Sequence, residues 1–153
     1  MAFGSLSLKG RALKLLAARE HSRAELARKL APHEAEPGEI ARALDDLQAR
    51  GFLDEQRVVD SLVHRRAGKL GAGRIRQELQ AKGLAADKVA EAVDQLRATE
   101  VDRAREVWRR KFGQPPQDAA ERARQTRFLM ARGFGAEAVR RAIAGGDEGH
   151  ADD

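Results

Sequence analysis

Large apolar residues in this chain recur three or four positions apart, as one buried face of a helix requires. The stretches at 11–19, 55–66 and 102–112 all show this spacing, for example through Leu13 and Leu16 in the first. Between such stretches lie glycine and proline, which end helices. The pattern therefore predicts a succession of short helices with one apolar side each.

A repeat is visible within this pattern, because residues 79–93 and 129–143 match at a constant offset of 50. Each copy has the form of a helix that ends at a glycine, Gly83 or Gly133, where a residue tolerant of positive φ is favoured. A buried apolar residue and a second helix with an acidic first turn follow. This order predicts a helical hairpin in each copy.

A looser third copy lies upstream, with residues 25–29 matching 78–82 at an offset of 53. Further along, Ile40 and Leu44 match the second copy at an offset of 49. We attribute the difference of four residues to an insertion in the loop at 31–38, which contains two prolines.

Each hairpin follows one of the three helical stretches, so we expect about nine helices grouped in three tandem three-helix modules. Capping signals agree, since Ser22 with Glu25 forms a capping box and Asp54 and Asp118 precede two other helices. The predicted fold class is all-α, with the modules in an elongated array that can curve. We expect the modules at 9–53, 54–98 and 99–144, between a mobile N-terminus at 1–8 and a mobile acidic tail at 145–153.

Modules of roughly 45 residues bury proportionately little surface and gain stability by packing against their neighbours. We expect the contacts between modules to be apolar. The candidates are Phe52 and Leu53 at the first junction, and Leu96 and Val101 at the second.

Composition narrows the classes of protein that remain. No cysteine is present, which excludes disulfide scaffolds and thiolate metal cages. Large apolar residues are few and β-branched ones fewer, so small helical cores are favoured over strands. Neither a membrane span nor a secretory pattern is found, and we expect a cytoplasmic protein.

The four histidines show no metal-ligand spacing, and we find neither a Gly-x-Ser-x-Gly elbow nor a phosphate-binding loop. We therefore expect no enzyme activity, no metal and no cofactor. Trp108 is expected in a core.

Positive charge dominates the body of the chain, with about +9 over residues 1–144 against −4 in the last nine residues. Such a balance favours an acidic partner, either nucleic acid or an acidic protein surface. The alternative is that the arginines only solvate helix faces.

Two basic clusters are the candidate contact surfaces. The first cluster surrounds the glycine-containing segment 68–73, an expected interhelical turn whose amides near Gly73 would add positive potential at a helix start. A helix-turn-helix that recognises the major groove of DNA is also possible, with Arg74, Gln77 and Ala81 on one helix face. The first cluster comprises Arg65, Arg66, Lys69, Arg74, Arg76 and Lys82, and the second comprises Arg103, Arg105, Arg109, Arg110 and Lys111.

Several segments together resemble the RecX family of bacterial regulatory proteins, over about residues 9–144. They are 19–26, 51–55, 74–79 and the ending Arg132-Gly133-Phe134. Their order and threefold arrangement carry the resemblance.

The resemblance implies a non-enzymatic modulator that binds along the groove of the RecA filament and inhibits the recombinase, ATPase and coprotease activities of RecA. Such a protein modulates DNA repair and recombination. A direct DNA-binding module that competes for single- or double-stranded DNA is the alternative. No heptad seam demands self-association, so we expect a monomer. From the two basic clusters, the residues that we predict to contact this partner or DNA are Arg65, Arg66, Lys69, Arg74, Arg76, Lys82, Arg103, Arg109 and Arg110.

Overall fold

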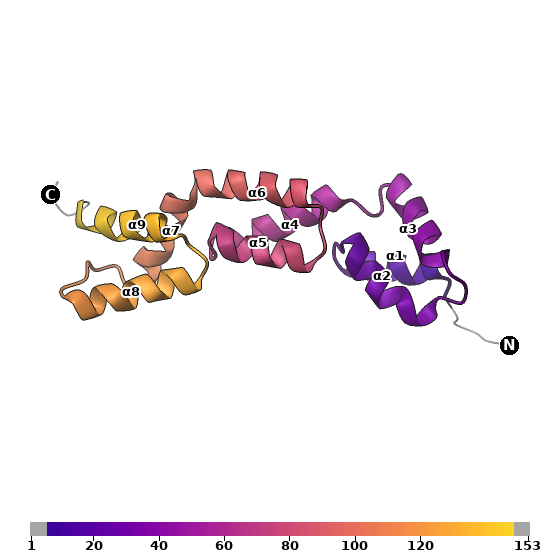
Figure 1. Cartoon of the computed structure of the whole chain (residues 1–153), viewed down its shortest axis with the longest axis horizontal. Coiled ribbons are helices and arrows are strands. Elements are labelled where there is room, and N and C mark those ends of the chain that lie inside the picture. The colour runs from indigo at the N-terminus through magenta and orange to yellow at the C-terminus, as the bar shows by residue number, and fades with distance from the viewer. Residues whose placement is uncertain (1–5, 149–153) are drawn as a thin grey trace.

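The computed structural model of the chain describes residues 6–148 (Figure 1). Within this range it contains nine α-helices, one short 3₁₀ turn and no strand, which confirms the all-α prediction. The first three helices are α1 (Leu8–Ala18), α2 (Arg23–Leu30) and α3 (Glu39–Ala49), with the 3₁₀ turn η1 (Ala31–His33) after α2. The next three are α4 (Glu55–Arg66), α5 (Ala72–Ala81) and α6 (Ala86–Ala98), and the last are α7 (Glu100–Lys111), α8 (Ala119–Ala131) and α9 (Ala136–Glu148).

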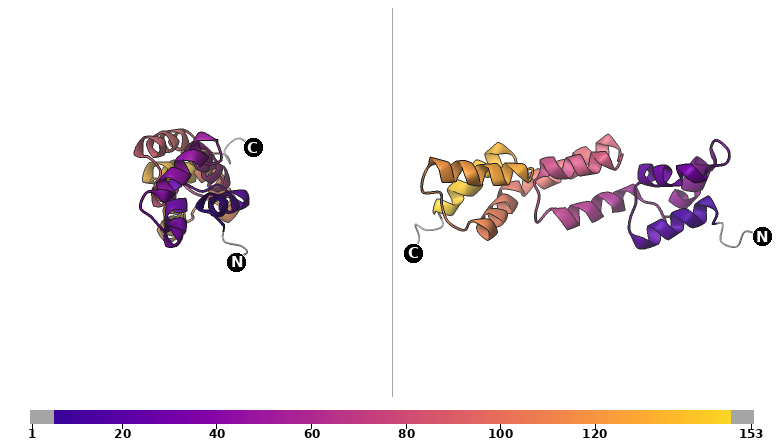
Figure 2. Two further views of the ribbon diagram at one scale, coloured as in Figure 1. Left: turned by 90° about the vertical axis from the view of Figure 1, so that its right-hand side faces the viewer. Right: turned by 90° about the horizontal axis from the view of Figure 1, so that it is seen from below.

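The three groups of helices follow one another in an extended row (Figure 1), which is narrow when seen from its end (Figure 2). Each group, called module 1, 2 or 3 below, encloses its own cluster of buried apolar residues. Leu26 and Leu44 belong to the first cluster, Ile75 and Leu79 to the second, and Leu129 to the third. The array is therefore built from three small cores that are not fused into one.

The two predicted glycine turns are confirmed. Gly83 and Gly133 have φ angles of 71° and 92°, a left-handed conformation that favours glycine. The next residues, Leu84 and Phe134, are 8% and 2% exposed. Each turn thus ends one helix and returns an apolar side chain to the core.

The proposed insertion in module 1 is wrong. Ser22 caps α2 and Gly71 caps α5, which sets their offset at 49, the same offset that relates the apolar faces of α3 and α6. The first loop is longer because α2 ends early, at Leu30, and continues as the 3₁₀ turn. At this offset the buried residues correspond, Leu26 with Ile75 and Leu30 with Leu79.

The predicted terminal segments also need correction. Ser7 caps α1 by accepting a hydrogen bond from the amide of Gly10, so helix begins inside the segment 1–8. At the other end α9 continues to Glu148, four residues into the predicted tail. The remaining parts of both predicted segments, 1–5 and 149–153, lie outside the described residues.

The apolar contacts expected between modules are not found. Leu53 is buried in the cluster of module 1 and Leu96 in that of module 2, while Phe52 is 50% exposed. Val101 is only partly buried and joins neither neighbouring cluster. The junctions are instead polar, and the glycine turns form them.

Candidate partner-binding surface

At the first junction, the turn between α5 and α6 lies on the start of α2. Ser22 Oγ donates a hydrogen bond to the carbonyl oxygen of Lys82 at 2.5 Å. The ammonium of Lys82 in turn lies 3.1 Å from Glu25 Oε1. A Cβ on Gly83 would stand 2.7 Å from that of Ala24, so the two backbones are close. Lys82, predicted as a partner contact, is therefore engaged inside the molecule.

Glu25 is the acceptor at the centre of this junction. Arg19 Nη2 lies 2.8 Å from Glu25 Oε2, and the amide of Ser22 donates to Glu25 Oε1. Burial by itself would raise the pKa of Glu25, but the hydrogen bonds from Arg19, Ser22 and Lys82 outweigh it and lower the pKa to about 2. The carboxylate is thus held ionised at the junction.

His21 is a buried member of the same region that the sequence did not single out, with 2% exposure. Its Nδ1 lies 3.0 Å from the carbonyl oxygen of Arg19, which can only accept a hydrogen bond, so Nδ1 carries the proton. Its Nε2 then accepts from Lys29 Nζ at 3.0 Å. Burial lowers the pKa of His21, in keeping with a neutral imidazole.

At the second junction, the turn between α8 and α9 lies on the start of α5 in the same way. The amides of Gly71 and Gly73 donate to the carbonyl oxygens of Arg132 and Gly133 at 2.8 and 3.1 Å. The amide of Ala72 donates to Glu100 Oε1 at 2.9 Å. Internal acceptors, among them the carboxylate of Glu100, thus occupy the amides near Gly73 that were expected to add positive potential.

Arg103 of α7 stabilises the same junction through hydrogen bonds to module 2. Its guanidinium donates to the carbonyl oxygens of Ala67, Leu70 and Leu96 at 2.9, 2.6 and 2.9 Å. Burial lowers its pKa, with Glu100 acting in the opposite direction. Arg103 holds three carbonyl groups of module 2, so its predicted role as a partner contact does not agree with its position.

The other predicted residues reach solvent. Arg65, Lys69 and Arg76 are exposed. Arg66 pairs with Glu78 at 3.4 Å, and Arg109 and Arg110 pair with Glu106 at 3.5 and 3.6 Å. Surface ion pairs of this kind contribute little and exchange readily with another anion. These six side chains are accordingly available to a partner.

Arg74 is exposed through its side chain but packed through its backbone. Its side chain is exposed and reaches the carbonyl oxygen of Ala131 at 3.4 Å, but its backbone packs against Gly133. The α8–α9 turn thus covers the start of α5. This position argues against α5 as a free recognition helix for a DNA groove.

Two hollows collect the basic side chains, one at each junction. In the first, of about 310 Å³, Arg65, Arg66 and Lys82 stand with Arg28 but face Glu25 and Glu78. In the second, of about 230 Å³, charged residues are all cations. Besides Lys69 and Arg110 it is lined by Gly68, Val107, Lys111, Phe128 and Arg132.

Of the residues that line the second hollow, the sequence had predicted Lys69 and Arg110 as partner contacts, in two separate clusters, but neither Phe128 nor Arg132. The spacing of Phe128 and Arg132, one turn apart on α8, was the signal that could have found them. Lys111 was noticed as part of the second basic cluster.

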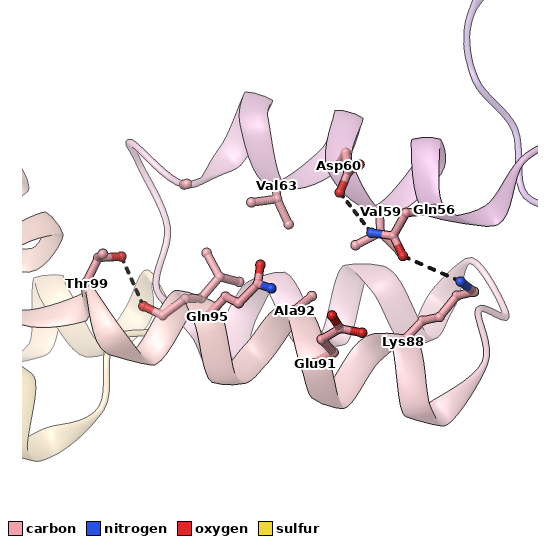
Figure 3. A pocket seen from close by; sticks show the side chains of 11 residues that line it. Gln56, Val59, Asp60, Val63, Lys88, Glu91, Ala92, Gln95 and Thr99 are labelled. Carbon is pink, nitrogen blue, oxygen red and sulfur yellow. Dashed lines mark hydrogen bonds between the residues drawn. The ribbon is translucent and has the colours of Figure 1, made fainter.

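A further hollow of about 210 Å³ lies between α4 and α6. Figure 3 shows Val59, Val63 and Ala92 along it, with polar side chains at the rim. There Gln56 bridges the two helices, since it donates to Asp60 at 2.9 Å and accepts from Lys88 at 3.5 Å. None of the predicted contact residues lines this groove.

The region from residue 6 to residue 148 contains no group of three His, Asp or Glu side chains placed to hold a metal ion. No helix of the described chain has the length and apolar character to cross a bilayer.

The fold and the surface define a class: tandem helical-repeat proteins with polar module junctions and exposed basic side chains around them. Comparison with known proteins identifies one family within this class. Three domain descriptions match in order: "RecX, first three-helix domain" at residues 9–47, "RecX, second three-helix domain" at 54–93 and "RecX, third three-helix domain" at 98–143. The chain belongs to the RecX family.

Relatives and solved structures agree with this assignment. "Regulatory protein RecX" of Leptothrix cholodnii is 66% identical over 145 residues, which cover 95% of this chain and 92% of the relative. The Ralstonia pickettii protein of the same name is 49% identical, with coverages of 94% and 90%. The crystal structure of RecX from Lactobacillus salivarius aligns with a TM-score of 0.80 at 17% identity, covering 92% of this chain and 95% of that one.

Proposed function

We propose that this protein is a non-enzymatic regulator of RecA that acts in the bacterial cytoplasm. It binds the RecA filament on single-stranded DNA and inhibits the recombinase, ATPase and coprotease activities of RecA. The family supports a regulatory role, and the relatives carry the name regulatory protein. The observation that carries the proposal is the extended row of three modules with exposed cations around both junctions.

An extended row suits binding along a filament. Each module offers a weak contact, and the covalent connection makes every contact after the first intramolecular. The chain therefore bridges neighbouring filament subunits and alters their assembly without performing chemistry. The proposed contacts are the predicted residues that remain exposed, namely Arg65, Arg66, Lys69, Arg74, Arg76, Arg109 and Arg110.

The test is the rate of ATP hydrolysis by the cognate RecA on single-stranded DNA, with this protein added before or after filament assembly. We expect the rate to fall at substoichiometric ratios and to stay low when excess naked DNA is added. An unchanged rate, or inhibition that free DNA abolishes, would contradict filament binding and favour competition for the strand.

The contact surface is tested by Arg65→Glu together with Arg76→Glu, two exposed residues that bear no described junction contact. Because both charges are reversed, we expect at least a tenfold higher concentration for half-inhibition of the ATPase. Arg97→Glu with Arg122→Glu is the matched control, since these arginines are also exposed and are not among the proposed contacts. Equal losses in both double variants would assign the effect to net charge rather than to this surface.

A further inference from the structure

The groove between α4 and α6 is a part of module 2 that the proposed contacts do not use. Both helices line it at intervals of three or four residues, so a continuous strip of each helix faces the groove. Its floor consists of small or aliphatic side chains, of which Val63 and Ala67 are only half-buried. A groove of this form, between two helices and without bulky side chains on its floor, is suited to receive a third helix.

The groove carries a carboxylate on each wall. Figure 3 shows Asp60 on α4 and Glu91 on α6, on the two sides of the floor. Both side chains are exposed, and within residues 6–148 neither of them forms an ion pair. Lys88, which also lines the groove, lies 3.5 Å from Gln56 Oε1 instead. Two carboxylates against one ammonium give the groove an excess of negative charge, in a chain whose net charge is +5.

The outer face of α8 has the complementary character. Ala120, Ala123, Arg127 and Met130 follow one another at intervals of three and four residues, so they form one line along the helix. All four are exposed, and Met130 is 48% exposed. In the part of the chain that the structure describes, Arg127 forms no ion pair. The line thus presents one cation between small or flexible apolar side chains.

We propose that the α4–α6 groove binds α8 of a second copy of this chain. The two alanines let the incoming helix approach the half-buried floor, and the flexible side chain of Met130 fills the remaining space. Arg127 then lies between the carboxylates of Asp60 and Glu91, so that opposite charges meet on both walls. The groove and α8 belong to different modules, so each copy can receive one helix and offer another.

This contact joins two different surfaces, so it can repeat from copy to copy instead of ending at a dimer. It covers one face of a helix of 13 residues, which is small for a stable complex, and we therefore expect a monomer in dilute solution. Where copies bind side by side on a filament, as proposed above, their high local concentration favours the contact and makes binding cooperative. The exposed cations around the junctions stay available to the filament.

The experiment measures the weight-average mass of the full-length protein by sedimentation equilibrium, without RecA, up to about millimolar concentration. We expect the mass of the parent protein to rise with concentration. Two charge-reversed variants, Arg127→Glu and the double variant Asp60→Lys with Glu91→Lys, should each associate at least about tenfold more weakly, because like charges then meet in the groove. An equimolar mixture of these variants should associate as the parent does, since the groove of each is complementary to α8 of the other.

The matched control is Arg97→Glu, because Arg97 is exposed on α6 but does not line the groove. It makes the same charge change as Arg127→Glu and should leave association within about twofold of the parent. Circular dichroism melting of each variant shows whether the fold is retained. A parent that stays monomeric at every concentration, or a mixture that does not recover association, would overturn the proposal. So would a mass that stops at twice that of the monomer, which indicates a symmetric dimer. Since RecA is absent, each outcome is independent of the proposed inhibition.

Discussion

Gly133 shows how one position serves both its own module and the junction. Its φ of 92° disfavours any side chain, and a Cβ there would lie 2.5 Å from the amide nitrogen of Arg74 and 2.9 Å from its Cα. These atoms are backbone and cannot move aside without separating α5 from the turn. The glycine is therefore required twice, by conformation and by space.

We expect Gly133→Val to lower the free energy of unfolding by about 2–5 kcal/mol, through backbone strain together with the forced separation of two modules. Urea denaturation followed by circular dichroism measures this loss. Gly68→Ala is the control, because Gly68 has no neighbour within 4 Å and its φ is not positive. A stable Gly133→Val variant would contradict the described junction.

Arg103→Lys tests the arginine that binds three carbonyl oxygens. Lysine keeps the charge but lacks the planar fork that reaches Ala67, Leu70 and Leu96 together. We expect a loss of about 2–4 kcal/mol in unfolding free energy, since hydrogen bonds from charged donors contribute more than neutral ones. Arg109→Lys, at a position whose side chain is 62% exposed, should change stability by less than about 0.5 kcal/mol.

Glu25→Gln tests the ionised carboxylate at the first junction. The folded pKa of about 2 lies below the ordinary value of 4.5, so the ionised form stabilises the fold. This contribution is complete above about pH 4.5 and is lost as the pH falls through about 2. We expect the variant to lose about 1–3 kcal/mol at pH 7 and to differ little from the parent protein near pH 2. A pH-independent difference in urea midpoint would contradict the ion pairs.

Whole helices were well predicted because their signals are local. The period of apolar residues located α4 at its observed bounds of Glu55–Arg66, and the capping box of Ser22 and Glu25 is present at the start of α2. Asp118 caps α8 as expected, accepting from the amide of Glu121 at 2.8 Å. Hydrophobic spacing and caps act within one or two turns, so sequence alone expresses them.

The predicted alignment of module 1 with module 2 was wrong for a physical reason. Offsets of 49 and 53 differ by four residues, or about one helical turn, and such a shift superposes one apolar face on another. Only the caps and the buried residues distinguish the two offsets. Leu13 shows a related error, since it was placed on the buried face of α1 but is 36% exposed.

Trp108 lies in a core as predicted, 3% exposed, but its partner was unexpected. Its indole Nε1 donates to Gln125 Oε1 at 2.7 Å, and Gln125 Nε2 donates to the carbonyl oxygen of Gln114. A buried glutamine replaces an apolar residue because the indole needs an acceptor.

The two junctions differ in kind across the array. At the second, backbone amides of Gly71 and Gly73 bind the next module directly, whereas the contacts described at the first all involve side chains such as Arg57 with Glu20 at 2.9 Å. Salt weakens exposed ion pairs more than backbone hydrogen bonds. Module 1 is thus tied to its neighbour by the more salt-sensitive contacts.

We expect raised salt to increase amide hydrogen exchange at the start of α2 more than at Gly71 and Gly73. Exchange measured by mass spectrometry in 0.05 and about 0.5 M salt tests this difference, since the Debye length falls from about 14 to about 4 Å. Exchange within α6, whose core is apolar, serves as the internal control. Equal changes at both junctions would show that they are held in the same way.

The candidate surface was predicted less well than the fold. Arg65, Arg76 and Lys69 are exposed as expected, while Lys82 and Arg103 turned inward to acceptors 57 or about 36 positions away in sequence. A charge count treats all cations alike. It cannot recognise which of them a distant carbonyl or carboxylate will bind.

The sequence alone predicts the helices of residues 6–148, their caps and the glycine turns, because each depends on residues within a few positions of one another. The threefold repeat is visible because the same local pattern recurs along the chain. The junctions and the hollows beside them depend on which turn lies on which helix start. Gly133 lies against Arg74, and Lys69 and Phe128 line one hollow, only after the modules have packed. Contacts of this kind join groups that no spacing rule relates. Tertiary packing therefore decides which cations bind acceptors inside the molecule and which stay exposed for a partner.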